Sequence, residues 1–206
     1  MPALFLILIY FFTFGCKVDT PENIKKDVPV THDKKTPIVF DVIMIRSFPK
    51  LGTFWPAEMP EFVFCKSSGI SRERANQGVF YWKNLGYPIT NVRYIEDGPE
   101  CRNINTYGKI IIKLIDNTVP INSNLSVTQV SFYRDSKQIQ SATIYLISAY
   151  ADKPRLIEHE IGHALGWKHY NRRNHVMNPE YSRTGFDYEG LEYVEYQTQS
   201  IDFFKN

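Results

Sequence analysis

The sequence reads PRLIEHEIGHALGWKH from Pro154 to His169, and this stretch decides how the domain is built. Proline is tolerated in the first turn of a helix, so we expect a helix to begin near Pro154. Its apolar side chains fall within an arc of about 100° when successive residues are placed around a helix; they are Ile157, Ile161, Ala164 and Leu165. This face is expected to pack against a β-sheet.

The opposite face of this helix carries imidazole groups. His159 and His163 lie one turn apart and about 40° apart around the axis, within reach of a single ion. Glu160 lies next to them, where its carboxylate can contact a water molecule rather than the ion. Gly166 can take a positive φ and turn the chain, which would bring His169 back as a third ligand. Three neutral nitrogens and one open position form a catalytic zinc site.

A helix with incidental surface histidines is the alternative. From ordinary residue usage, HExxH arises by chance in about one chain in a hundred of this length, and adding the glycine and the third histidine lowers this to on the order of one in a hundred thousand. The apolar arc, the glycine turn and the third histidine agree with one another, which favours the metal site. His175 has the spacing of no third ligand, and we expect a structural or solvent-facing role for it.

Two motifs resemble the signature of the metzincin metallopeptidases, which is HExxHxxGxxH with a downstream Met-turn. They are HEIGHALGWKH at residues 159–169 and NHVMNP at residues 174–179, and the short gap between them is most similar to the matrixin branch. The resemblance implies one catalytic zinc ion, a general base and a methionine that forms a hydrophobic floor. These would be His159, His163 and His169 for the metal, Glu160 for the base and Met177 for the floor.

The rest of the chain predicts an α/β (α+β) domain over residues 37–206. We expect a helix that begins after Ser71 and ends at Gly86, and a second helix in the aromatic-rich tail at 186–204. Strands are expected at 37–48, 61–67, 89–97 and 107–116, with two more within 127–148. The run KIIIKLI is nearly continuous, as in a strand covered on both faces. The metzincin resemblance implies a mixed, mostly parallel twisted sheet with a backing helix, active-site helix, Met-turn and C-terminal helix.

The first fifteen residues differ from the rest of the chain. The apolar run from Ala3 to Phe14 is twelve residues long, too short for a bilayer-spanning helix of about twenty, and is typical of an export signal. Gly15 and Cys16 follow and resemble the lipobox of bacterial lipoproteins, which implies cleavage before Cys16 and a lipid anchor there. An ordinary cleaved signal or a short uncleaved anchor are the alternatives. Residues 16–36 are charged and read as a flexible tether.

Two cysteines remain if Cys16 is lipidated. Cys65 and Cys101 can form a disulfide in an oxidising compartment, whereas two buried free thiols are the alternative. Cys65 lies at the end of one predicted strand and Cys101 follows the next, and the ends of parallel strands lie at the same edge of a sheet. The disulfide is therefore expected to join two neighbouring strand ends.

Composition excludes some partners. The chain of 206 residues has a formal net charge of +2 and no basic tract, so no nucleic-acid partner is expected. We expect an exported monomer that hydrolyses protein or peptide substrates and is attached to the outer face of a bacterial membrane by lipid, or is otherwise secreted. The alternatives are a zinc-binding surface lipoprotein without activity, and a peptidase restricted to one partner or to its own chain. Calcium binding is left open, because the oxygen-rich loop at 116–124 is better read as an exposed polar loop.

Overall fold

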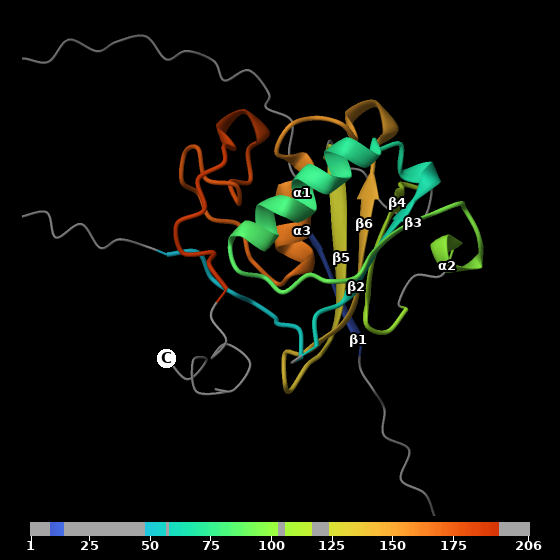
Figure 1. The fold of residues 1–206 in the computed structure, drawn as a ribbon. Coiled ribbons are helices and arrows are strands. Elements are labelled where there is room, and N and C mark those ends of the chain that lie inside the picture. The colour runs from blue at the N-terminus through green and yellow to red at the C-terminus, as the bar shows by residue number, and fades with distance from the viewer. Residues whose placement is uncertain (1–8, 15–47, 57, 103–105, 117–123, 194–206) are drawn as a thin grey trace, which may run out of the picture.

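A mixed sheet with helices packed on one face forms the domain in the computed structural model. The structure describes residues 9–14, 48–56, 58–102, 106–116 and 124–193. The sheet order is β1-β5-β6-β4-β2-β3 (Figure 1). Four of these strands run parallel, and they are β2 (Glu61–Cys65), β3 (Val92–Ile95), β4 (Lys109–Leu114) and β6 (Ile139–Leu146). Strand β5 (Ser126–Tyr133) is antiparallel to β6.

Strand β1 (Ile9–Phe14) adds an outer strand that pairs antiparallel with β5, with Phe14 opposite Thr128. These six residues lie within the predicted signal peptide, and all of them are aromatic or β-branched, which suits an extended strand. This pairing is possible only while residues 9–14 are attached to the chain. The predicted cleavage before Cys16 would remove them and leave the outer edge of β5 unpaired by β1.

Two helices form a layer over one face of the sheet. Helix α3 (Leu156–Ala164) packs directly on β5 and β6, and α1 (Arg72–Asn84) packs against α3 (Figure 1). The predicted apolar arc of α3 is buried in the core beneath it, as expected. Helix α3 begins after Arg155, whose φ of 69° is not helical, so Pro154 lies just before the helix rather than in its first turn.

The helix predicted to begin after Ser71 is present as α1. The Ser71 hydroxyl caps α1 by accepting a hydrogen bond from the Arg74 amide, and Gly86 follows the helix with a φ of 92°. The remaining helices are short: α2 is Pro99–Arg102, and three single 3₁₀ turns span Lys66–Ser68, Ser148–Tyr150 and Tyr181–Arg183.

The second face of the sheet is covered near β2 and β4 by a smaller apolar cluster. Val63, Ile111 and the disulfide between Cys65 and Cys101 form this cluster, and the Cα atoms of the two cysteines are 6.0 Å apart. Ile110, Ile111 and Ile112 are all buried, which confirms that β4 is covered on both faces. Cys101 reaches β2 from α2, so the disulfide joins the end of one strand to the segment that follows its parallel neighbour.

The predicted strands agree with β2 to β6, but one prediction is wrong. Residues 186–193 form turns rather than a C-terminal helix, because the backbone of Asp187 pairs with Asn174 and Val176 across the chain. Residues 194–204 of that predicted helix lie outside the described residues. So do the predicted tether at 16–36, residues 37–47 of the first predicted strand and most of the 116–124 loop.

Candidate metal centre

Three histidines from α3 and the turn after it converge on one point. The candidate ligand atoms of His159, His163 and His169 all lie within 4.8 Å of one another, so the group can hold a metal ion. The Nε2 atoms of His159 and His163 are 3.0 Å apart. Two nitrogens of a tetrahedral zinc site are separated by about 3.3 Å, given zinc–nitrogen distances of about 2.05 Å. The His159 and His163 side chains are buried, and His169 is partly exposed.

Backbone carbonyls determine which nitrogen of each buried ring faces the centre. The Nδ1 atom of His159 is 2.7 Å from the Val176 carbonyl oxygen, and that of His163 is 2.8 Å from the Trp167 carbonyl oxygen. A carbonyl can only accept, so Nδ1 carries the hydrogen in both rings. Each neutral ring then has a lone pair on Nε2, as a metal ligand requires.

Burial keeps both rings neutral. Removal from water, followed by the charge of His169, lowers the pKa of His159 to about 3. The pKa of His163 is also lowered, mainly by burial and then by His159 and His169. Neither ring therefore carries a second proton at neutral pH, and two lone pairs face each other across a short gap. A cation between them satisfies both, so the residues present fit a bound metal ion.

Gly166 provides the turn that brings the third histidine back. Its φ is 105°, and a Cβ atom there would overlap the Thr53 carbonyl oxygen. The Gly166 carbonyl accepts a hydrogen bond of 2.8 Å from the Gly52 amide, which anchors the turn to the loop before β2. The turn also places the Trp167 carbonyl against the His163 ring. Gly166 thus turns the chain with a positive φ, as predicted, and the contact with Thr53 explains why no larger residue fits there.

The segment around Met177 lies against α3 at Gly162. Met177 is buried, and a Cβ atom on Gly162 would overlap its Sδ atom and come within 2.9 Å of Trp82. Gly162 therefore lets the methionine approach the helix between His159 and His163. The preceding residue, Val176, holds the His159 ring through its carbonyl. The sequence analysis did not identify this role of Gly162, although it lies within the histidine motif.

Glu160 contacts strand β5 with both oxygens of its carboxylate. The Ser126 hydroxyl donates to Oε1 at 2.6 Å, and the Thr128 hydroxyl donates to Oε2. The Glu160 side chain is fully buried. Burial raises its pKa to about 7, whereas the two hydroxyl groups act in the opposite direction. Neither hydroxyl residue could be predicted, because nothing in a strand sequence shows which helix side chain the strand will contact.

A buried ion pair supports α3 from α1. Nη1 of Arg74 donates to Glu158 Oε1 at 2.7 Å, and Nη2 of Arg74 contacts the other carboxylate oxygen. The Trp82 indole also donates to the Glu158 carbonyl at 2.9 Å. Glu158 precedes the first candidate ligand, so these contacts fix the turn of α3 that carries His159.

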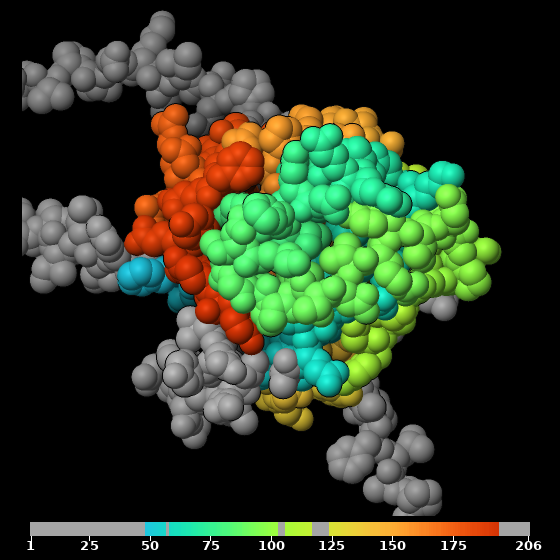
Figure 2. All heavy atoms as spheres, in the orientation of Figure 1, coloured from blue at the N-terminus to red at the C-terminus, as the bar shows by residue number. Residues whose placement is uncertain are grey.

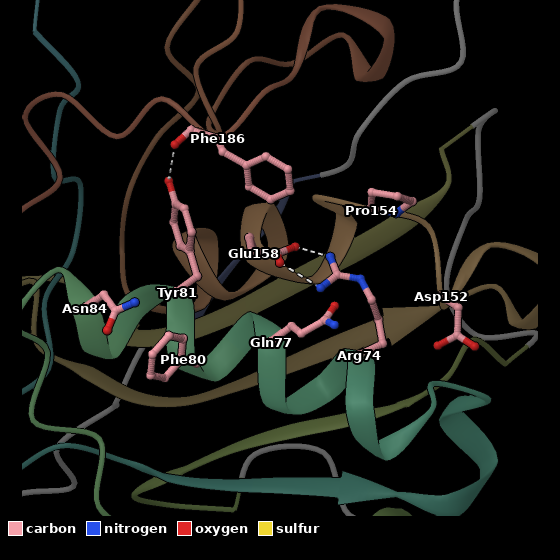
Figure 3. Close-up of a pocket in the computed structure, with 9 residues that line it drawn as sticks. All are labelled: Arg74, Gln77, Phe80, Tyr81, Asn84, Asp152, Pro154, Glu158 and Phe186. Carbon is pink, nitrogen blue, oxygen red and sulfur yellow. Dashed lines mark hydrogen bonds and ion pairs between the residues drawn. The ribbon is translucent and has the colours of Figure 1, made fainter.

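A surface pocket of about 500 Å³ lies above this ion pair (Figure 3). Figure 2 shows α1 and the chain that follows Met177 side by side on this face of the molecule, and both contribute residues to the pocket. Exposed Phe80 and Phe186 line it, and the Tyr81 hydroxyl donates to the Phe186 carbonyl. The lining residues include neither Glu160 nor the three histidines, so the pocket is separate from the candidate metal centre.

The other predicted residues take different positions. His175 is buried outside the cluster, where its Nδ1 atom accepts a hydrogen bond from the Met177 amide. Cys65 and Cys101 are joined to each other, so their sulfurs are not thiolate ligands, although Asp97 lies beside them. Cys16 lies outside the described residues.

No protein-family model matches the chain, and no curated protein matches it in sequence. The features that bear on function are therefore the histidine group and the buried Glu160 carboxylate.

Proposed function

We propose that this chain is a zinc-dependent endopeptidase of the metzincin type. The observation that carries the proposal is the pair of facing Nε2 atoms, 3.0 Å apart, on rings whose Nδ1 atoms are held by backbone carbonyls. His169 adds a third nitrogen to the group. Three imidazole nitrogens suit zinc, and three protein ligands leave a fourth position for the reaction.

Glu160 supplies the proton transfer in the proposed reaction. When bound, zinc contributes Lewis acidity that polarises the scissile carbonyl and makes water a stronger nucleophile at neutral pH. The Glu160 carboxylate takes a proton from the attacking water and passes it to the leaving amine. A protein that only bound zinc would not require this carboxylate, so its presence beside the ligands supports an enzyme.

The surrounding fold supports the same proposal. The partly parallel sheet, the helix α1 behind α3, and the buried methionine after the third histidine are all features that the metzincin resemblance implied. The described part of the tail departs from the expected C-terminal helix.

The test is Glu160→Gln, which keeps the size and hydrogen bonding of the side chain but removes the base. Zinc should remain, and hydrolysis of a broad peptide library should fall by at least about 10²-fold. Glu73→Gln, at an exposed position in α1, is the control and should keep full activity. A wild-type protein that binds zinc but cleaves no peptide would favour the zinc-binding lipoprotein. Cleavage of only one partner or of the chain itself would indicate a restricted peptidase.

We also propose that the protein is exported and carries a lipid anchor at Cys16. The apolar run of the first fourteen residues and the Gly15-Cys16 pair support this. Among the described residues, no helix has the length and apolar character needed to cross a membrane. Cys16→Ser should abolish metabolic lipid labelling and release the protein from the membrane fraction. A mature N-terminus at any residue other than Cys16 would contradict the lipid anchor.

A further inference from the structure

Strand β5 presents two hydroxyl groups to the carboxylate that the proposed reaction uses. Ser126 and Thr128 are two residues apart, so their side chains project from the same face of the strand toward α3. Each hydroxyl contacts a different oxygen of Glu160. All three side chains are fully buried. The contacts are therefore shielded from water, in surroundings where hydrogen bonds are strong and costly to leave unmade.

Two contacts on two oxygens fix the carboxylate plane, which one contact would leave free to rotate. Each carboxylate oxygen has two lone pairs, and one hydroxyl uses one of them. One lone pair on each oxygen is left to accept a proton. Hydroxyl groups also carry no charge, whereas a lysine or arginine at either position would repel a cation held by the histidines.

We propose that Ser126 and Thr128 are positioning residues that hold the Glu160 carboxylate in its reactive orientation. The expected effect on the catalytic rate rests on the proposed function. The hold, by which we mean the two hydrogen bonds from Ser126 and Thr128 to Glu160, does not depend on that function. Neither residue touches a reacting atom in this scheme, because each acts through Glu160. If the hydroxyls orient Glu160, their removal should lower the catalytic rate and leave the metal content unchanged. If they support metal binding, their removal should lower the metal content.

The first experiment tests the hold without any substrate. Thr128→Val replaces the hydroxyl by a methyl group of similar size and leaves one Glu160 oxygen without its donor. In metal-free protein it should lower the unfolding midpoint by about 3–10 °C. In a Glu160→Met background the carboxylate is absent and only the longer contact of the Thr128 hydroxyl with the backbone carbonyl of residue 160, at 3.4 Å, is left; replacing both side-chain partners by apolar groups is nearly neutral. There Thr128→Val should change the midpoint little, and equal shifts in the two backgrounds would overturn the hold.

The second experiment tests the orientation during catalysis. Thr128→Val should retain stoichiometric zinc and lower kcat by about 10- to 100-fold with little change in KM, because a small misplacement of a reacting group is costly. Thr128→Ser keeps the hydroxyl and should restore most of kcat. Ser126→Ala should behave as Thr128→Val does, because it removes the donor to the other oxygen.

Thr143→Val is the matched control for these variants. Thr143 is buried in β6 and pairs with Ile111 of β4, which belongs to the cluster on the face away from α3. Its replacement should leave kcat near the wild-type value.

The outcomes separate the two proposals. An unchanged kcat in Thr128→Val, or a Thr128→Ser variant as slow as Thr128→Val, would overturn the positioning role. Loss of zinc from Thr128→Val at wild-type concentrations of metal would also overturn it, since it would indicate a role in the metal centre. A wild-type protein without peptidase activity would overturn the proposed function, and the unfolding experiment would then decide the hold alone.

Discussion

The Arg74 guanidinium is paired with the Glu158 carboxylate inside the interface between α1 and α3, one residue before His159. Both side chains are almost completely buried. The turn of α3 that carries the first candidate ligand is therefore tied to α1 by an ion pair as well as by apolar packing. Such a pair is most costly when only one partner is removed, because the remaining charge is left without compensation in the interior.

Replacement of Arg74 alone is expected to be severe. Arg74→Met should lower the free energy of unfolding by about 3–5 kcal/mol, because it leaves the Glu158 carboxylate buried and unpaired. Urea unfolding followed by circular dichroism measures this. The double variant Arg74→Met, Glu158→Leu should recover much of the loss. Arg72→Met, at an exposed position of the same helix, should cost well under half as much, and an equal cost would show that the ion pair is unimportant.

Zinc binding is expected to require the three-histidine group. Wild-type protein should contain one zinc ion per chain, and His163→Ala should contain almost none, because two nitrogens hold zinc much less tightly than three. Elemental analysis after dialysis against low zinc measures the content. His175→Asn is the control, since His175 lies outside the group and asparagine keeps an acceptor for the Met177 amide. Stoichiometric zinc in His163→Ala would make the ligand assignment wrong.

Metal removal should weaken the fold. A metal ion at a thousandfold excess over its dissociation constant stabilises the native state by about 4 kcal/mol if it does not bind the unfolded chain. For a domain of this size that corresponds to about 8–16 °C in Tm. Differential scanning calorimetry with and without a chelator should show this shift, and added zinc should reverse it. Reversal by calcium as effectively as by zinc would contradict a nitrogen-ligated site.

Gly166 should tolerate no side chain. Gly166→Ala places a Cβ atom on the Thr53 carbonyl and forces an unfavourable φ, so we expect a loss of roughly 3 kcal/mol or more together with weaker zinc binding. Unfolding midpoints and zinc titration measure the two effects. Gly98→Ala is the control, because a Cβ atom there would meet nothing closer than the Glu96 carbonyl at 3.9 Å. Similar midpoints for the two variants would contradict the packing at Gly166.

The disulfide should stabilise the folded protein, because it closes a loop and so restricts the unfolded chain. Cys65 and Cys101 are 36 residues apart, and a loop of this length corresponds to about 3–4 kcal/mol in the chain-entropy description. The double variant Cys65→Ala, Cys101→Ala should unfold at correspondingly lower denaturant concentration. Mass spectrometry of the non-reduced protein should detect a peptide in which the two cysteines are joined. Two thiols that react with an alkylating agent in the folded protein would contradict the bond.

The features that could be predicted from the sequence are those that depend on short spacings along the chain. The apolar arc of α3, the single turn between His159 and His163, and the Ser71 cap all depend on steps of at most four residues from one position to the next. The same reasoning failed at residues 186–193. There the aromatic spacing favoured a helix, but backbone pairing of Asp187 with Asn174 and Val176 holds the chain in turns. Local preference is weak enough for such pairings to override it.

By itself, the sequence of this protein determined the candidate ligands, the candidate base and the glycine at the turn, because helix and turn geometry convert their short spacings directly into positions in space. Only the tertiary structure decided which groups support them. Ser126 and Thr128 reach Glu160 across 34 and 32 residues, and Arg74 reaches Glu158 across 84. Such contacts depend on the order and direction of strands in the sheet, which result from the packing of the whole domain and from no single stretch of its sequence.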